Sequence, residues 1–124
     1  MAEPDEQAAA IEPFQEGEVI LLDDRVTGFD DNKEDRPYCV ARVVGDPLEF
    51  VLVVPRTTDG TIGTLTEAGV LPQLNKRGRF LYRPYQVFPA DLKTVKRIGV
   101  LPPTIAKKVL ENVNFAALDL EIEW

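Results

Sequence analysis

The chain has 124 residues, 44% of them hydrophobic and 28% charged, which suits one domain with a modest core. It contains no histidine and no serine, which excludes Ser-His-Asp and Cys-His hydrolases and removes the usual nitrogen ligand of zinc sites. Acid–base chemistry must then come from carboxylates, Lys, Tyr or Arg, and we expect neither a metal nor a cofactor.

The net charge of −7 conceals an uneven distribution. Residues 1–35 hold 12 acidic and two basic side chains, whereas residues 36–113 hold 12 basic and six acidic ones. Residues 114–124 add three acidic side chains and no basic one. The negative net charge alone argues against binding a phosphate backbone. The central segment 36–113 is positively charged, however, and is compatible with such binding.

The chain divides into three predicted parts. Residues 1–15 are acidic and poor in bulky side chains, which is typical of a flexible leader. Residues 16–113 are expected to form the folded domain, and residues 114–124 an acidic and apolar extension. The leader lacks the basic region of a signal peptide, and the longest apolar run, 50–54, is too short to span a bilayer. The single Cys39 lies among apolar neighbours and is expected to be a buried, inert thiol. These features favour a cytoplasmic protein without membrane contact.

The first half of the domain predicts strands separated by polar loops. Residues 19–22 form a short apolar run that predicts a buried strand, and residues 25–35 have a loop composition. Residues 38–44 and 49–54 are rich in β-branched side chains, and the Gly-Asp-Pro sequence at 45–47 predicts that they form a hairpin.

The second half predicts shorter elements. The Gly- and Thr-rich segment 57–69 predicts a loop with a short strand near 61–65, and a basic turn at 76–79 precedes strands at 80–82 and 85–88. Apolar residues three positions apart predict a helical turn within 89–98. Apolar residues four positions apart predict an amphipathic helix over 103–113. The alternation of apolar and acidic residues over 118–124 predicts a strand. We therefore expect a mainly β fold with a C-terminal helix, a small SH3-like barrel.

Two polar residues flank the predicted hairpin at its open end. Arg36 precedes the first strand and Thr57 follows the second, so antiparallel pairing brings a guanidinium beside a hydroxyl. This pair suits a phosphodiester and the extra charge of its transition state. The alternative is structural: Arg36 pairs with Asp23, Asp24 or Asp35, and Thr57 caps a turn.

A second group of residues suggests a track for a nucleic-acid backbone, with Tyr82 and Tyr85 as stacking platforms. The alternative is a solvated turn with the tyrosines half in the core. The basic members of the track are Arg56, Lys76, Arg77, Arg79 and Arg83.

The order of several short motifs resembles the MazF/PemK toxins of bacterial toxin–antitoxin modules. They are Gly17-Glu18-Val19-Ile20-Leu21, Arg36-Pro37, Val53-Val54-Pro55-Arg56-Thr57-Thr58, Gln86 and Ile98-Gly99-Val100-Leu101. The resemblance implies an SH3-like barrel that forms a homodimer and cleaves single-stranded RNA without a metal. It also implies an antitoxin partner whose acidic segment occupies the RNA groove.

Carried over to this chain, the resemblance assigns catalysis to Arg36 and Thr57. Arg36 would serve proton transfer and transition-state charge, and Thr57 would supply the hydroxyl. The reaction would be attack of a ribose 2′-OH on the adjacent phosphorus. The RNA-binding residues would be Arg56, Thr58, Lys76, Arg77, Arg79, Tyr82, Arg83 and Gln86.

Two other functions remain open. One is a barrel without catalysis that contacts proteins through its tail and Trp124, and the other is a gyrase-poisoning toxin of the CcdB type, which shares this barrel. The tail 118–124 either adds to the sheet as an edge strand, forms a dimer contact, or folds over the basic groove and restrains activity.

Overall fold

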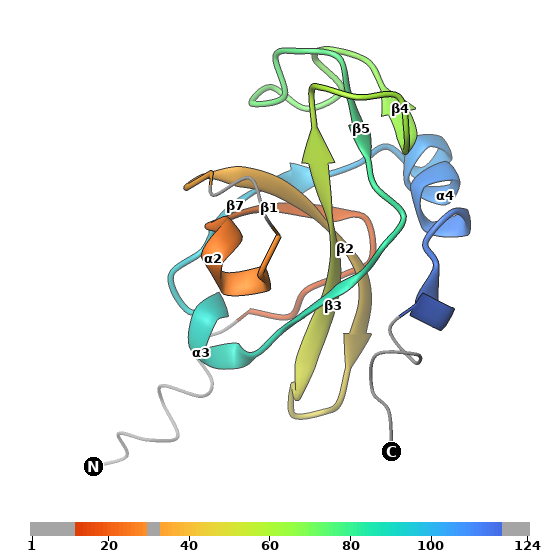
Figure 1. Cartoon of the computed structure of the whole chain (residues 1–124). Helices are drawn as coiled ribbons and strands as arrows, with labels where there is room; N and C mark the ends of the chain where they lie inside the picture. Colours follow the sequence, from red (N-terminus) through yellow and green to blue (C-terminus); the bar gives the residue numbers. More distant parts are fainter. Residues whose placement is uncertain (1–11, 30–32, 118–124) are drawn as a thin grey trace.

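The structure is a computed structural model of the chain, and it describes residues 12–29 and 33–117. Within these residues the protein is mainly β, with seven strands and three short helices (Figure 1). None of these helices is long and apolar enough to cross a membrane. The strands are β1 (Glu18–Leu22), β2 (Arg36–Val44), β3 (Phe50–Thr57), β4 (Thr64–Thr66), β5 (Gly78–Phe80), β6 (Tyr85–Val87) and β7 (Lys96–Val100); the helices are α2 (Asp24–Thr27), α3 (Pro89–Leu92) and α4 (Pro103–Glu111).

The described strands form one antiparallel sheet in the order β4-β5-β3-β2-β1-β7. The sixth strand, β6, lies off this path and pairs with an earlier stretch of β3 than β5 does. The sheet curls into a half-barrel, and α4 lies beside it near β4 (Figure 1). The prediction of a mainly β protein is confirmed, and the curled sheet is consistent with a small β-barrel.

The hairpin of β2 and β3 forms the centre of the sheet, as the sequence predicts. Its ladder runs from Tyr38↔Pro55 to Val44↔Phe50, with a bulge after Val40. Gly45 turns the chain with φ +95°, and a Cβ there would lie 2.8 Å from the amide nitrogen of Glu49. Only glycine allows so tight an approach at this backbone conformation.

Apolar side chains cover both faces of the sheet, which explains why β1 reads as a continuous apolar run. Val19 belongs to a core cluster that α4 covers through Val109, whereas Ile20 belongs to a second cluster that includes Phe14 and Leu92. Successive side chains on a strand point to opposite faces, so each face needs its own cover. The curled sheet is stabilised by two small clusters rather than one.

Two predicted segments differ from the structure. The polar segment 25–35 was expected to be a loop, but α2 occupies its start because Asp23 caps the first turn and Gly28 ends it in the left-handed region. The helical turn expected within 89–98 is present as α3, but it ends at Leu92, and Ile98 lies in β7, which pairs with β1. The gain from pairing with a central strand outweighs the local spacing of apolar residues. The helix predicted over 103–113 is confirmed as α4.

The folded part of the chain also begins earlier than the predicted boundary at residue 16. Phe14 is 7% exposed, and the Arg97 guanidinium lies 4.0 Å from the centroid of its ring. Arg97 also donates to the carbonyl oxygens of Glu12 and Pro13, at 2.9 and 2.7 Å, and forms an ion pair with Glu18 at 2.6 Å. The Phe14 side chain is therefore part of the core, although Glu12, Pro13, Gln15 and Glu16 around it are exposed. The strand predicted over 118–124 lies outside the described residues.

Candidate functional site

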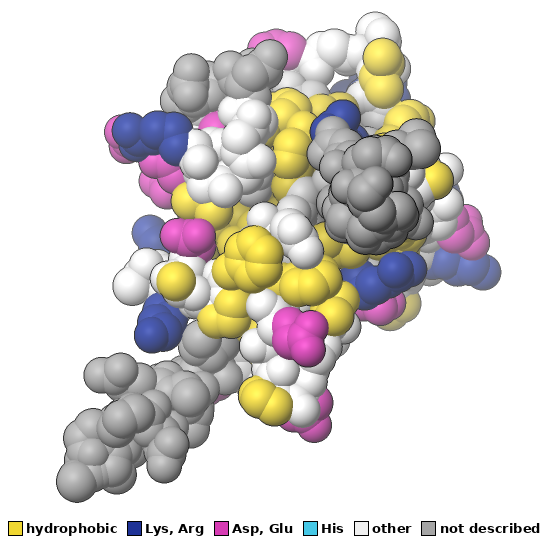
Figure 2. Space-filling view, turned by 60° about the horizontal axis from the view of Figure 1, so that its bottom comes forward, with side chains coloured by type: hydrophobic (Ala, Val, Ile, Leu, Met, Phe, Trp, Pro, Cys, Tyr) yellow, Lys and Arg dark blue, Asp and Glu magenta, His cyan; other side chains and the backbone are white. Residues whose placement is uncertain are grey.

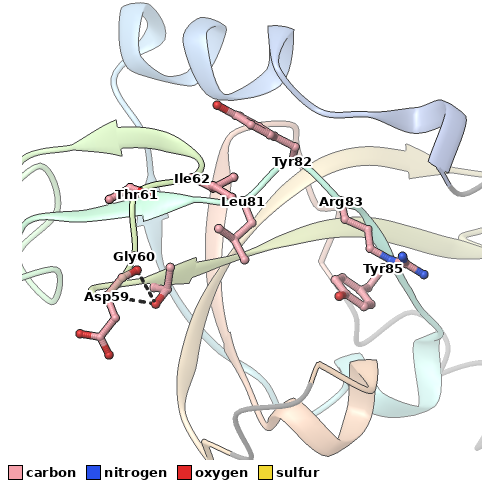
Figure 3. Close-up of a pocket in the computed structure, with 9 residues that line it drawn as sticks. Asp59, Gly60, Thr61, Ile62, Leu81, Tyr82, Arg83 and Tyr85 are labelled. Carbon is pink, nitrogen blue, oxygen red and sulfur yellow. Dashed lines mark hydrogen bonds between the residues drawn. The ribbon is translucent and has the colours of Figure 1, made fainter.

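An open pocket of about 620 Å³ lies between the end of β3, the loop that leads to β4 and the segment between β5 and β6 (Figure 3). From the pair Arg56↔Phe80 to the pair Val53↔Tyr85, β3 moves by three residues and the facing segment by five. The facing segment therefore arches away from β3 and leaves a hollow, whose volume suits a nucleotide-sized ligand. Its lining residues are Thr57, Asp59, Gly60, Thr61, Ile62, Leu81, Tyr82, Arg83 and Tyr85.

The loop between β3 and β4 forms one wall of the pocket. Gly63 has φ +120°, and a Cβ there would lie 2.6 Å from the carbonyl oxygen of Phe80, so the loop passes β5 this closely only with glycine. The Nη1 of Arg79 donates to the Gly63 carbonyl oxygen at 3.0 Å and fastens the loop to β5. This wall leaves Ile62 66% exposed at the rim.

Thr57, predicted as the hydroxyl residue of the site, lines the pocket at the end of β3. Its Oγ1 accepts a hydrogen bond from the Asp59 amide nitrogen at 3.1 Å and donates to the Asp59 carbonyl oxygen at 3.2 Å. The side chain therefore stabilises a turn, as in the structural alternative. A hydroxyl oxygen has two lone pairs, so Thr57 can still accept a hydrogen bond from a ligand.

Aromatic rings and a guanidinium form the opposite wall. Tyr82 is 39% exposed, and the Arg83 guanidinium lies 5.7 Å from the centroid of the Tyr85 ring. In Figure 3, Tyr82 points toward α4 while Arg83 and Tyr85 lie together on the other side of Leu81. Rings of this kind stack on planar groups, and a guanidinium binds phosphate or carboxylate.

Arg36, the other predicted catalytic residue, lies behind this site. Its Nη1 donates to the carbonyl oxygen of Arg56 at 2.8 Å, so the guanidinium contacts the backbone just before Thr57 rather than the Thr57 hydroxyl. Arg36 is only 3% exposed, however, and its guanidinium lies 4.8 Å from the centroid of the Phe29 ring. The expectation of a guanidinium open to substrate is corrected: in the structure Arg36 is enclosed.

The enclosure contains an ion pair, as the structural alternative states. The Nε of Arg36 donates to both carboxylate oxygens of Asp24, at 2.9 and 3.1 Å, and Asp24 is fully buried. Burial raises the pKa of the Asp24 carboxyl, but hydrogen bonds from Arg36, the Lys33 amide and the Tyr38 hydroxyl outweigh it and lower the pKa below 3.8. Burial raises the pKa of Tyr38 well above 10. At neutral pH the pair is therefore charged and the phenol is neutral.

Arg56 was expected on an accessible track but lies inside the fold, at 4% exposed. Its Nε donates to Thr66 Oγ1 at 3.1 Å, and its Nη2 donates to the carbonyl oxygens of Thr66 and Lys76 at 3.4 and 2.7 Å. Burial lowers the pKa of Arg56. Its charge ties β3 to β4 and to the turn before β5, where a ligand outside the protein does not reach it.

The remaining predicted residues are dispersed. Arg77 forms an exposed ion pair with Glu67 at 3.2 Å, and Thr58 and Lys76 are exposed but do not line the pocket. Gln86 lies half-buried in β6, opposite Leu52. Of the predicted binding and catalytic residues, the pocket collects Thr57, Tyr82 and Arg83, together with Tyr85, the second predicted stacking platform.

Sequence reasoning missed part of the lining. Asp59, Ile62 and Leu81 were not predicted for the site. The available signal was Ile62, a large apolar residue in a loop of Gly, Thr and Asp, where a strand had been expected. Its exposure of 66% marks it as part of a surface rather than of the core.

The described residues contain neither an accessible cysteine nor a cluster of side chains that could bind a metal ion. Cys39 is fully buried, and burial raises the pKa of its thiol to about 12, so the prediction of an inert thiol is confirmed. No group of three or more Cys, Asp or Glu side chains among residues 12–29 and 33–117 could hold a metal ion.

Comparison with protein families, with curated proteins and with solved structures finds no match for this chain. The pocket itself therefore has to support any functional argument.

Proposed function

We propose that the protein is an SH3-like barrel of the MazF/PemK type that binds single-stranded RNA in this pocket and cleaves it without a metal. The observation that carries the proposal is that one hollow is lined by Thr57, Tyr82, Arg83 and Tyr85. Stacking on rings is worth about 1–3 kcal/mol per base and requires an unpaired base. A guanidinium beside such rings suits the adjoining phosphate.

The proposed reaction is the one that the resemblance to the MazF/PemK toxins implies. The ribose 2′-OH attacks the adjacent phosphorus, a P–O2′ bond forms and the P–O5′ bond breaks. The 2′-OH loses its proton and the leaving 5′ oxygen gains one, so the products are a 2′,3′-cyclic phosphate and a 5′-hydroxyl end. Thr57 would turn its hydroxyl proton from the Asp59 carbonyl oxygen toward the reacting phosphate and donate to it, and Arg83 would stabilise the negative charge of the phosphate.

In this proposal Arg36 is a positioning residue rather than one that touches RNA. Its hydrogen bond to the Arg56 carbonyl holds the end of β3, and its charge is balanced by Asp24. The cognate partners remain those that the resemblance implies, an antitoxin protein and a second copy of the chain, in the cytoplasm.

A second candidate is a barrel without catalysis that binds proteins. Figure 2 shows hydrophobic side chains across the middle of the face seen from the lower end of Figure 1. Phe88, at 50% exposed, precedes α3 and contacts Phe50 edge to face, with ring centroids 5.9 Å apart. The buried ion pair of Arg36 also fits this candidate, because a binding module needs no exposed catalytic guanidinium.

The experiment is cleavage of a long single-stranded RNA in EDTA. Thr57→Val is compared with Thr58→Val, and Arg83→Ala with Arg77→Ala, because the second member of each pair is exposed and lies outside the pocket. Discrete cuts should fall about 10²–10³-fold in Thr57→Val, the usual cost of one lost donor to a developing charge. Thr58→Val and Arg77→Ala should cut as the wild type does.

Three results would contradict the proposal of a nuclease site in this pocket. Cuts that persist in Thr57→Val would place the nuclease outside this pocket. RNA binding without cutting, lost in Arg83→Ala and weakened by salt, would leave an RNA-binding barrel without catalysis. Absence of both binding and cutting would favour the protein-binding candidate, for which Phe88→Asp is the informative variant.

A further inference from the structure

Arg79 lies at the border of the pocket, directly across the ladder from Thr57. The two residues form a Cα pair between β3 and β5, and side chains of such a pair point to the same face of the sheet, with Cβ atoms about 4.5–5.5 Å apart. Two residues later, Leu81 lies on that face and lines the pocket as Thr57 does; its amide nitrogen donates to the Pro55 carbonyl oxygen at 2.9 Å, so the pairing with β3 continues. The sheet therefore places a guanidinium beside Thr57, in the position that the sequence predicts for Arg36.

The side chains of Thr57 and Arg79 hold the two ends of the loop that forms one wall of the pocket. Thr57 Oγ1 bonds to the backbone of Asp59, and Arg79 Nη1 donates to the carbonyl oxygen of Gly63 at 3.0 Å. A Cβ on Gly63 would lie 3.0 Å from the Cβ of Arg79, so the loop rests on the stem of the arginine. Asp59 is the acid among the lining residues, and in Figure 3 its carboxylate points away from Leu81. The guanidinium is thus fixed at the end of this wall, and the loop presents no carboxylate toward Leu81.

Most donors of the Arg79 guanidinium remain available to a ligand. A guanidinium has five N–H groups, and the bond to Gly63 uses one of them. Within residues 12–29 and 33–117, Nε and Nη2 of Arg79 have no acceptor, and its charge has no carboxylate partner. This part of the chain also contains no buried side-chain nitrogen without a hydrogen bond, so both atoms of the half-buried Arg79 reach solvent. Arg36 and Arg77, by contrast, each form an ion pair with a carboxylate. Arg79 is therefore suited to an anion from outside the chain.

We propose that Arg79 and Thr57 form a phosphate-binding site, and that Arg79 is a catalytic residue that binds the reacting phosphodiester. The catalytic role rests on the proposed function, and the bonds that form and break remain P–O2′ and P–O5′. The planar edge of the guanidinium donates to the non-bridging phosphate oxygens while the Thr57 hydroxyl donates beside it. These bonds strengthen as negative charge accumulates on the phosphate in the transition state. Arg79 thus supplies next to Thr57 the charge that the enclosed Arg36 does not.

Inorganic phosphate tests the site without RNA. NMR spectra of the ¹⁵N-labelled full chain, at constant ionic strength, follow the Arg79 Nε–H signal and the Asp59 amide. We expect both signals to move with phosphate concentration and to saturate, and chloride to move neither. Arg79→Gln should abolish the change at Asp59, whereas Arg77→Gln, in an exposed arginine paired with Glu67, should leave it intact. Unmoved signals, or a response at Asp59 that persists in Arg79→Gln, would overturn the proposal.

The RNA arm separates binding from chemistry. A 2′-O-methyl RNA, whose 2′ oxygen cannot attack, measures binding alone, and each phosphate contact on a single strand adds about 0.7 to the slope of log affinity against log salt. Arg79→Gln should lower the slope by about this amount. It should also slow single-turnover cleavage of unmodified RNA about 10²–10³-fold. Arg79→Lys should recover the slope and only part of the rate, because an ammonium lacks the planar fork. Arg77→Gln should match the wild type in rate.

Gly63→Ala distinguishes the charge of Arg79 from its hold on the loop. The added Cβ displaces the loop and keeps the cation, so cleavage should fall while the salt slope stays unchanged. Circular dichroism checks that each variant is folded. If Arg79→Gln behaves as Gly63→Ala does, Arg79 only holds the loop and the proposal is overturned. Wild-type cleavage in Arg79→Gln would also overturn it and leave the proposed function standing. A saturable phosphate response at Arg79 with no RNA binding in the wild type would refute the proposed function and confirm the phosphate site.

Discussion

Asp24→Asn tests the buried ion pair behind the pocket. Asp24 is fully buried and accepts hydrogen bonds from Arg36 Nε, the Lys33 amide and the Tyr38 hydroxyl, the last two at 2.9 and 2.8 Å. Asparagine keeps the shape, but it leaves the Arg36 charge uncompensated and turns an amide N–H₂ toward one of these donors. Removing one partner of a buried pair costs about 3–5 kcal/mol.

The assay is urea unfolding followed by circular dichroism. A loss of about 3 kcal/mol lowers the midpoint by about 1.5 M urea for an m-value near 2 kcal/mol/M. Asp23→Asn is the matched control, because Asp23 is the helix cap next to Asp24, pairs with the exposed Arg25, and asparagine caps a helix equally well. The control midpoint should change little.

The same pair predicts a pH dependence. The Asp24 carboxyl has a pKa below 3.8 in the folded protein, so the folded state binds fewer protons there than the unfolded state does. The stability that Asp24 contributes is present above its unfolded pKa and is lost as the pH falls through its lower folded pKa. The difference between wild type and Asp24→Asn should therefore shrink below about pH 4. A difference under about 1 kcal/mol at neutral pH, or one that stays constant in acid, would refute the assignment of a buried charged pair.

Three other predictions concern the core. Thr66→Val removes the hydroxyl that accepts from Arg56 and donates to the Gly78 carbonyl oxygen, so we expect a loss of about 1–3 kcal/mol in urea unfolding; an unchanged midpoint would mean that Arg56 finds other partners. Phe14→Ala should cost about 3 kcal/mol, because the ring belongs to a core cluster, and no loss would restore the domain boundary at residue 16. Cys39, with a pKa of about 12 and no exposed surface, should react with a thiol reagent only after unfolding; fast labelling of the folded protein would contradict its burial.

Local sequence determined most of the strands and the C-terminal helix. The β-branched runs of β2 and β3 and the Gly-Asp-Pro turn between them act over a few residues, so they could be read without the fold. The spacing of apolar residues gave a wrong prediction where pairing with a strand distant in the sequence determined the secondary structure. Ile98 shares an apolar spacing with Leu92 but lies in β7, because its neighbours Arg97 and Gly99 pair with β1, which is distant in the sequence, and Ile98 lies at the bulge between them.

For the site, the residue types indicated candidates, but only the tertiary structure decided which of them face a ligand. Thr57, Tyr82 and Arg83 line one pocket, because the segment after β5 arches away from β3. Arg36 and Arg56 look equally available in the sequence, yet both are buried, and their partners Asp24 and Thr66 are 12 and 10 residues distant. An arginine is cationic in any sequence; whether its charge meets solvent, a carboxylate or a carbonyl depends on long-range packing, which composition and spacing do not encode.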